Sequence, residues 1–393
     1  MKSKKLAFGI ITPSLIQPEP ILNFLDNAKK FGHIINDLIV CCYDFGKPDI
    51  INFFQEKCKV TMIKRGHSSF LQNSLKNLGL SNDEIQILLG TPNLEKYGKA
   101  AYGISRNYIL LAALFLGIDY LFFFDTDVLP KILYEFKEEK YKFEEIDFVG
   151  SHLKYLKRKN VVVTTSDYTG YYIIPKMNFP YLMELLYGIQ KEDRFNYIST
   201  KDKPVTKNTH LQNVFNTRKA LGGNLAIDFN KFDILPPFFS TTLILDNECF
   251  LGRGEDTLLG PIIYHAGGRC VDIDLFIFHN CFDDFPNIPH IHIKKNMDRF
   301  FYACMGWIIR NPFFNWLGKE YNEKAEEIDY EKRLAALKIG SKAAAEHFND
   351  KRFLKLPDAF ELAYKKLPED IDHFFRLTET WSKMKTLIKE KQR

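Results

Sequence analysis

Two carboxylates separated by one residue follow an unbroken apolar segment and form the clearest chemical signal in this sequence. The segment 121–124 (Leu-Phe-Phe-Phe) ends in Asp125, Thr126 and Asp127. In open α/β sheets the ligand crevice lies beyond the carboxyl ends of the strands, so both acids are expected on its floor. Carboxylates suit Mg²⁺ or Mn²⁺, which complete their shells with phosphate oxygens and water. The pair could thus hold a cation against a diphosphate, although such acids also occur in ordinary turns.

This arrangement resembles the D-x-D motif of the GT-A glycosyltransferases, in which the motif ends a central strand. The resemblance implies transfer of a hexose from a UDP- or GDP-sugar to a hydroxyl of a saccharide or small-molecule acceptor. Asp125 would contact the donor ribose or the metal, and Asp127 would bind Mn²⁺ or Mg²⁺. A cation on the diphosphate stabilises the negative charge that develops as the sugar–phosphate bond breaks.

Two segments on either side of the acidic pair extend this resemblance. Residues 103–107 (Gly-Ile-Ser-Arg-Asn) open a helix ahead of the strand, and residues 220–227 resemble the Gly-Gly-Asn loop and strand of the family. The resemblance implies that Arg106, Gly223 and Asn224 approach the donor. From the residues alone, Arg106 could equally pair with a neighbouring acid, and the glycines could form a tight turn.

A second acidic pair and a histidine follow in the order that the family shows. Glu255 and Asp256 resemble its x-E-D motif, in whose inverting members the Asp takes the acceptor's proton. Asp256 is the candidate base and Glu255 its neighbour or an acceptor-binding group. Both acids also suit the first turn of a helix. His279 follows the apolar run 275–278, where the family often has a metal ligand, although a lone His is more often structural.

The amino-terminal half offers weaker candidates for donor binding. Thr12 and Pro13 follow the first expected strand, where nucleotide contacts begin in the family, and Asp44 follows the second, where an acid often meets the base. All three also suit ordinary turns. The sequence has no evident Q-x-x-R-W motif, which argues against a processive synthase.

Two other functions stay open. A sugar-phosphate nucleotidyltransferase also uses metal-bound acids, but it usually has a Gly-rich loop where this sequence has Thr-Pro-Ser-Leu (12–15). A non-catalytic nucleotide-sugar-binding protein would hold the donor without turnover. Soluble mannosylglycerate synthases combine a GT-A core with a helical carboxyl-terminal part, and this comparison keeps a retaining reaction open beside an inverting one.

Alternating strand and helix patterns must position these residues. We expect strands at 6–12, 37–43, 60–63 and 120–124 with helices at 20–31 and 104–116. This alternation predicts a parallel α/β sheet, the Rossmann-like core of the GT-A class. Beyond it we expect strands at 148–150, 161–165 and 171–174, a helix at 181–189 and a polar loop at 191–208.

The carboxyl-terminal quarter is rich in helix formers, notably at 322–347 and 358–366. We therefore expect a catalytic domain over 1–288 and a mainly helical extension over 289–393. The aromatic stretch 297–317 suits a helix packed on the core better than an interfacial membrane segment, with a dimer contact or an acceptor lid as alternatives.

The amino-acid composition excludes several other classes of protein. The 393 residues are 46% hydrophobic, so the chain can bury a sizeable core, and 54 basic against 49 acidic residues give no case for a nucleic-acid protein. Seven cysteines without C-x-x-C spacing argue against a disulfide scaffold. The start resembles a mature amino terminus, and Gly117 and Asp119 interrupt the longest apolar stretch. We expect a cytoplasmic protein without a transmembrane segment, with peripheral membrane association and homo-oligomers through the extension as further possibilities.

Overall fold

A mixed eight-stranded sheet forms the centre of the protein in the computed structural model, which describes residues 4–46, 48–90, 97–171, 174–200, 202–208, 213–282, 284–321 and 329–392. Its strand order is β10-β14-β8-β11-β4-β1-β2-β3. These strands are β1 (Leu6–Ser14), β2 (Asp37–Asp44), β3 (Lys59–Lys64), β4 (Tyr120–Phe124), β8 (Val161–Thr165), β10 (Phe215–Thr217), β11 (Asn224–Asp228) and β14 (Arg269–Asp272). β1 pairs in parallel with β2 and β4, whereas β11 runs antiparallel to β4 and β8.

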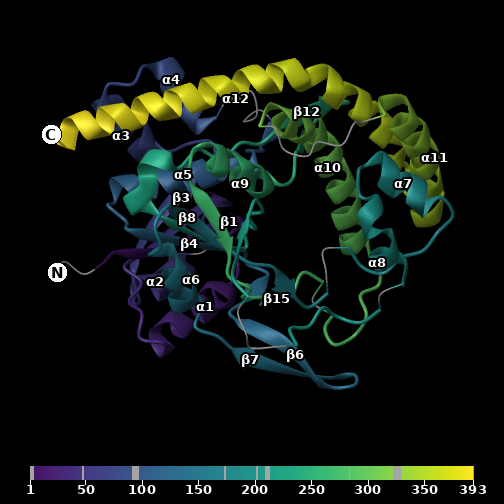
Figure 1. The fold of residues 1–393 in the computed structure, drawn as a ribbon, viewed down its shortest axis with the longest axis horizontal. Coiled ribbons are helices and arrows are strands. Elements are labelled where there is room, and N and C mark those ends of the chain that lie inside the picture. The colour runs from purple at the N-terminus through teal and green to yellow at the C-terminus, as the bar shows by residue number, and fades with distance from the viewer. Residues whose placement is uncertain are drawn as a thin grey trace.

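Helices cover both faces of this sheet (Figure 1). Side chains alternate along a strand, so Phe122 and Phe124 of β4 face one apolar cluster while Leu121 and Phe123 face the other. The first cluster includes residues of α1 (Glu19–Lys30), α2 (Pro48–Gln55) and α6 (Phe148–Leu156). The second includes residues of α3 (Ser69–Leu78), α4 (Asn82–Leu89), α5 (Tyr102–Phe115) and α9 (Glu255–His265). Because both faces are covered, the apolar run of β4 is unbroken.

The carboxyl-terminal helices pack on the sheet region and on a third apolar cluster. They are α10 (Lys294–Glu320), α11 (Tyr330–Phe348) and α12 (Leu356–Gln392), and the third cluster also includes α7 (Leu182–Gly188) and α8 (Phe195–Thr200). In Figure 1, α12 crosses the top of the molecule towards α3 and α4. Trp381 of α12 is buried, and its indole Nε1 donates to the Leu235 carbonyl at 2.9 Å. The extension thus shares apolar clusters with residues before 288, and the domain division at 288 stays a prediction.

In the described part of the chain, three small sheets accompany the central sheet, and the first of them follows the carboxyl ends of β4, β8 and β14. They are β5 (Val128–Leu129) with β15 (Ile277–His279) and β9 (Tyr168–Thr169), the hairpin of β6 (Lys131–Lys137) and β7 (Lys140–Glu145), and the pair β12 (Thr242–Leu245) and β13 (Glu248–Leu251). In the first of these sheets His279 pairs in register with Val128, and the Asn280 amide donates to the Asp127 carbonyl at 2.7 Å. This pairing brings residues 127 and 279 together.

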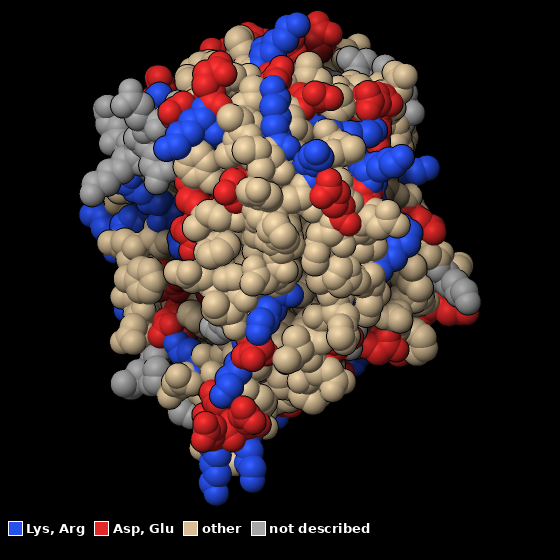
Figure 2. All heavy atoms as spheres, turned by 90° about the vertical axis from the view of Figure 1, so that its right-hand side faces the viewer, with Lys and Arg blue, Asp and Glu red and all other residues tan. Residues whose placement is uncertain are grey.

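The face that carries α7 and α11 has a broad central area with few charged side chains (Figure 2). Met183 of α7 and Ile339 of α11 are exposed large apolar residues. Association of the chain through its extension stays a prediction.

The predicted α/β core with a helical carboxyl-terminal part is confirmed, and three details are corrected. The sheet is mixed, because β11 and β10 run antiparallel to their neighbours. Residues 148–150 begin α6 and are not a strand, since the Asp147 carboxylate caps a helix there by accepting from the Gly150 amide at 2.8 Å. The expected loop 191–208 contains α8. Residues 172–173 and 322–328, within an expected strand and helix, lie outside the described part of the chain.

Candidate functional site

A pocket of about 740 Å³ opens beyond the carboxyl ends of β1 and β4, between the sheet region and α10. Residues from widely separated parts of the sequence line it. Seven of the residues predicted from the sequence are among them: Pro13, Arg106, Asp125, Asp127, Glu255, Asp256 and His279. The pocket therefore brings together both acidic pairs and the candidate histidine.

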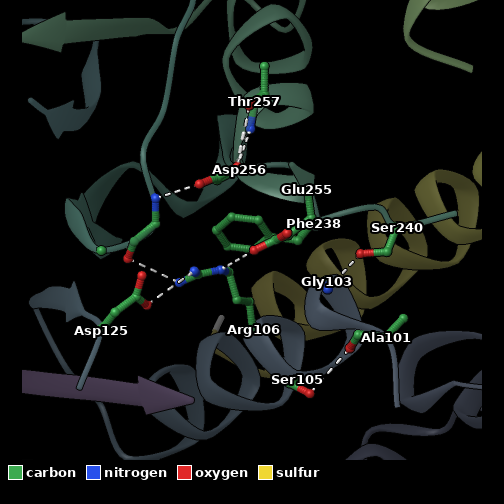
Figure 3. Close-up of polar contacts among 12 residues, drawn as sticks. Ala101, Gly103, Ser105, Arg106, Asp125, Phe238, Ser240, Glu255, Asp256 and Thr257 are labelled. Carbon is green, nitrogen blue, oxygen red and sulfur yellow. Dashed lines mark hydrogen bonds and ion pairs between the residues drawn. The ribbon is translucent and has the colours of Figure 1, made fainter. Parts of the chain in front are cut away.

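Arg106 of α5 joins the two acidic pairs beneath the pocket (Figure 3). Its Nε donates to Glu255 Oε1 at 2.8 Å, and its Nη2 lies 4.0 Å from Asp125 Oδ1. The guanidinium also lies 5.1 Å from the Phe123 ring centroid. A buried guanidinium is stable only when it is paired, and here two acids and a carbonyl, that of Gly222 at 3.3 Å, surround it. Arg106 thus lies beside one acid of each pair. Its contact with Glu255 is the pairing with an acid that the sequence allowed as an alternative to donor binding.

Glu255 and Asp256 occupy the first turn of α9, after Gly254 with φ +89°. Asp256 Oδ2 accepts from the Gly222 amide and Oδ1 from the Thr257 amide, each at 2.7 Å (Figure 3). Burial raises the pKa of Glu255, with the adjacent Asp256 charge acting in the same direction and Arg106 opposing both. The Gly222 and Thr257 amides therefore fix the Asp256 carboxylate, and Oδ2 keeps a lone pair for a further partner, whereas Oδ1 also accepts from Thr257 Oγ1 at 3.4 Å.

Asp125 lies on the pocket floor directly above Gly223. A Cβ at Gly223 would lie 2.6 Å from Asp125 Oδ2, so only glycine permits this approach. Burial raises the pKa of Asp125, the Arg106 charge opposes this rise, and the charge of Asp127 adds to it. Asp125 is thus the acid of its pair that holds a proton more readily.

Asp127 lies between His279 and Arg299, a residue of α10. Its Oδ1 is 3.8 Å from His279 Nε2, and its Oδ2 accepts from Arg299 Nη2 at 3.0 Å. Burial acts to raise the pKa of Asp127, but the charges of His279 and Arg299 outweigh burial and hold it below its usual value. Burial lowers the pKa of His279, which favours the neutral imidazole that can bind a metal.

Asp127 and His279 have the donor chemistry for a divalent cation. The Nδ1 atom of His279 is buried without a hydrogen-bond partner in the described structure, so the ring orientation is not set by a protein acceptor. Nowhere in the described residues do three or more His, Cys, Asp or Glu side chains converge as a metal cluster. Two protein ligands suit Mg²⁺ or Mn²⁺ when phosphate oxygens and water complete the shell. The residues present therefore fit a cation that is shared with a phosphate ligand.

Four predicted site residues do not line the pocket. Thr12 is buried and its Oγ1 donates to the Ser14 carbonyl at 2.8 Å, and the exposed Asp44 accepts from the Gly46 amide at 3.1 Å. Gly223 lies behind Asp125. The ligand roles of these three residues stay predictions.

Asn224, the fourth of these residues, connects strands below the pocket. Its Nδ2 donates to the Leu275 carbonyl at 2.8 Å, and its Oδ1 lies 3.1 Å from Nε2 of the buried His152. These contacts support β11 from behind, and a role in donor binding stays a prediction.

Sequence reasoning missed the contribution of α10 to the pocket. Arg299, Trp307, Arg310 and Phe314 of this helix line it, while the opposite face of α10 packs into the apolar clusters. A signal was present, since Arg299 and Arg310 are eleven residues apart and so lie on one side of a helix. The aromatic stretch 297–317 is thus both a packed helix and a wall of the site.

The fold and the site define an α/β protein with a ligand pocket at the carboxyl ends of its strands, in which acids, a histidine and several cations converge. In the described part of the chain, no helix has the length and apolar character needed to cross a membrane. No protein-family model and no curated protein matches the chain.

Solved structures of glucosyl-3-phosphoglycerate synthase from Mycobacterium tuberculosis are similar to it at a low level. The complex with Mg²⁺ and UDP has 13% sequence identity and a TM-score of 0.39, covering 81% of this chain and 80% of that chain. The complex with Mn²⁺, UDP and phosphoglyceric acid has 12% identity and a TM-score of 0.38, covering 81% and 79%. A mycobacterial protein has 13% identity and a TM-score of 0.36, covering 77% and 74%. These likenesses are weak, and the function proposed below rests on the pocket.

Proposed function

We propose that this protein is a metal-dependent GT-A glycosyltransferase that transfers a hexose from a UDP- or GDP-sugar to a hydroxyl of a small-molecule or saccharide acceptor. One observation carries the proposal. A single pocket at the strand ends brings the Asp125–Asp127 pair, His279 and the Glu255–Asp256 pair together. Three sequence segments supply these groups, and each has the residue types that one part of this reaction needs.

In this proposal the two ends of the acidic cluster have different tasks. Asp127 and His279 hold Mn²⁺ or Mg²⁺, which supplies positive charge to the donor diphosphate when bound. Asp125, held near Arg106, faces the donor ribose or the metal. The bond from the sugar C1 to the diphosphate breaks, a bond from C1 to the acceptor oxygen forms, and the hydroxyl gives up its proton.

Asp256 lies where the acceptor would bind, and the Gly222 and Thr257 amides fix its orientation. In an inverting reaction Asp256 takes the acceptor's proton directly. In a retaining reaction it positions the acceptor, and the anomeric configuration of the product separates the two. Glu255, paired with Arg106, keeps the turn that presents Asp256 in place.

Release of nucleoside diphosphate from a panel of UDP- and GDP-sugars tests the proposal. We expect release that requires Mn²⁺ or Mg²⁺, stops with a chelator and is lost in Asp127→Asn, while the variant keeps the circular-dichroism spectrum of the unmodified chain. Pyrophosphate release from a nucleoside triphosphate and a sugar phosphate would instead identify a nucleotidyltransferase. Tight donor binding without any release would identify a non-catalytic binding protein. Either result rejects the proposal.

A further inference from the structure

Positive charge collects at the end of the pocket that lies between α10 and the segment joining α7 to α8. Lys191 and Arg194 come from that segment, Arg253 precedes α9, and Arg310 belongs to α10. Among the described residues, no Asp or Glu oxygen lies within 4.0 Å of a side-chain nitrogen of Lys191, Arg253 or Arg310. These cations are separate from Arg106 and Arg299, which are paired with the acids of the site.

Arg310 shows most clearly that these cations lack a carboxylate partner in direct contact. Its side chain is buried, with 7% of the residue exposed, and its Nε has no hydrogen-bond partner in the described structure. Its Nη2 donates to Asn311 Oδ1 at 2.9 Å, and its guanidinium lies 5.1 Å from the Phe314 ring centroid. A buried cation without a carboxylate partner is costly unless a ligand supplies the missing negative charge.

Lys191 adds a second cation beside Arg310. Its Nζ lies 5.1 Å from the Trp307 ring centroid, within the pocket. The acids next to Lys191 in the sequence are engaged elsewhere, since Glu192 Oε1 pairs with Arg333 Nη2 at 3.0 Å and Asp193 Oδ2 with Arg194 Nε at 3.2 Å. The local acids therefore form no ion pair with Lys191 or Arg310, although Asp193 acts on Lys191, and Asp256 and Glu255 act on Arg310, through their charges at longer range.

These cations adjoin the second acidic pair. A Cβ at Gly254, the residue before Glu255, would lie 2.5 Å from Arg310 Nη1, so the guanidinium touches the start of α9. The Arg253 amide donates to the Gly306 carbonyl of α10 at 3.1 Å, which ties this turn to the helix. A small molecule held by the cations would therefore lie beside Asp256.

We propose that Lys191, Arg253 and Arg310 form a subsite for the anionic group of the acceptor, a carboxylate or a phosphate, and that the acceptor's reacting hydroxyl lies towards Asp256. This inference rests on the proposed function, because only that function makes the bound ligand an acceptor. The donor diphosphate has its own site at Asp127 and His279, so a second anion accounts for the second group of cations. A neutral saccharide would leave Arg310 and Lys191 without a directly paired anion.

Calorimetric titration of the full chain with inorganic phosphate, in saturating UDP and Mn²⁺, tests the subsite directly. Lys191→Gln removes one charge at a position that is not fully buried and is expected to fold, whereas a variant of the buried Arg310 risks misfolding. We expect Lys191→Gln, and independently Arg253→Gln, to weaken phosphate binding about tenfold, as for loss of a charge-assisted bond. Lys191→Arg should keep the affinity within about threefold. Lys176→Gln, outside the pocket, is the matched control and should change nothing.

Acetate in the same titration distinguishes a subsite that binds carboxylates from one that prefers phosphate. The proposal is supported if the affinity for either ion falls in Lys191→Gln. Equal phosphate affinity in Lys191→Gln and the unmodified chain would overturn it. A loss of UDP affinity in Lys191→Gln as large as the loss of phosphate affinity would also overturn it, because the cations would then be part of the donor site. Phosphate binding that depends on Lys191 in a chain that binds neither UDP nor GDP would reject the glycosyltransferase function and keep the subsite. Donor turnover that prefers neutral acceptors over anionic ones would reject the subsite and keep the glycosyltransferase function.

Discussion

Arg299 Nη2 lies 3.0 Å from Asp127 Oδ2, so a guanidinium from α10 pairs with the carboxylate that follows β4. The second nitrogen of this group, Nη1, donates to the Cys281 carbonyl at 3.0 Å, just beyond the candidate ligand His279. A carboxylate that already has a cationic partner binds a second cation less strongly, because the two positive charges repel. Arg299 therefore competes with a divalent cation at Asp127.

Replacing Arg299 by Gln should strengthen binding of Mn²⁺ in the absence of nucleotide. The Arg299–Asp127 pair is partly exposed, so we expect a gain of about threefold to tenfold, which corresponds to roughly 1 kcal/mol. Electron paramagnetic resonance of free Mn²⁺ measures this affinity without any turnover. Arg299→Lys keeps the charge and should bind Mn²⁺ much as the unmodified chain does. Unchanged or weaker Mn²⁺ binding in Arg299→Gln would contradict the competition.

Removing Arg106 should destabilise the fold as well as the site. Arg106→Met leaves the buried Glu255 carboxylate without its partner at 2.8 Å, and loss of one member of a buried pair costs about 3–5 kcal/mol. The free energy of unfolding in urea measures this loss. The double variant Arg106→Met, Glu255→Gln should recover part of the loss, because the stranded charge is gone. A loss below about 1 kcal/mol in the single variant would show that Glu255 finds another partner.

A methyl group at Gly222 should disturb the same pair from the loop side. Its Cβ would lie 1.9 Å from Arg106 Nη2, so the guanidinium must move or the loop must shift. We expect Gly222→Ala to lower nucleotide-sugar turnover at least about tenfold, since the Gly222 amide also holds Asp256. Gly79→Ala is unsuitable as a control because of its positive φ, whereas Ala101→Gly changes one methyl group at the residue before α5 without a clash. Full turnover in Gly222→Ala would show that the Arg106 position is not critical.

Binding of an anion at the cationic end of the pocket should weaken as pH rises. Burial, helped by the nearby charges of Arg310 and Arg194, lowers the pKa of Lys191 to about 8, although Asp193 and Glu192 act in the opposite direction. Lys191 carries its charge below this pKa and loses it above, so anion affinity should fall between about pH 7 and pH 9. Sulfate is the suitable probe, because its own charge is constant in this range. In Lys191→Arg the fall should disappear, and an unchanged fall would assign the titration to another group.

The sequence predicted the central strands well because their physical signals are local. The apolar run 120–124 and the helical spacing before it are visible in one window, and the two acids after it mark a strand end. Strand direction is not a local property, so nothing in residues 224–228 showed that β11 runs antiparallel. The start of α6 differs from the expected strand because two apolar residues and a glycine suit either element, and only the Asp147 cap decides between them.

The candidate site was predictable where it follows strand ends and was not predictable where it depends on long-range packing. Asp127 and His279 meet because β5 and β15 pair, which places two strand-terminal residues in register. Arg299 reaches Asp127 across 172 positions of sequence, and Arg310 meets Gly254 through a helix for which the sequence favoured packing on the core over an acceptor lid. Such contacts depend on how α10 lies on the sheet region; the eleven-residue spacing of Arg299 and Arg310 places them on one side of a helix but does not show what that side faces.

The central claim is that Asp127 and His279 hold a divalent cation against the diphosphate of a nucleotide. Calorimetric titration of UDP and of GDP, each with Mn²⁺ and with a chelator, tests it most directly in the unmodified chain, Asp127→Asn and His279→Ala. We predict that one nucleotide binds with Mn²⁺, and that either substitution or the chelator weakens it at least about tenfold. Nucleotide binding of equal strength in the three proteins, with Mn²⁺ and with the chelator alike, would contradict the claim.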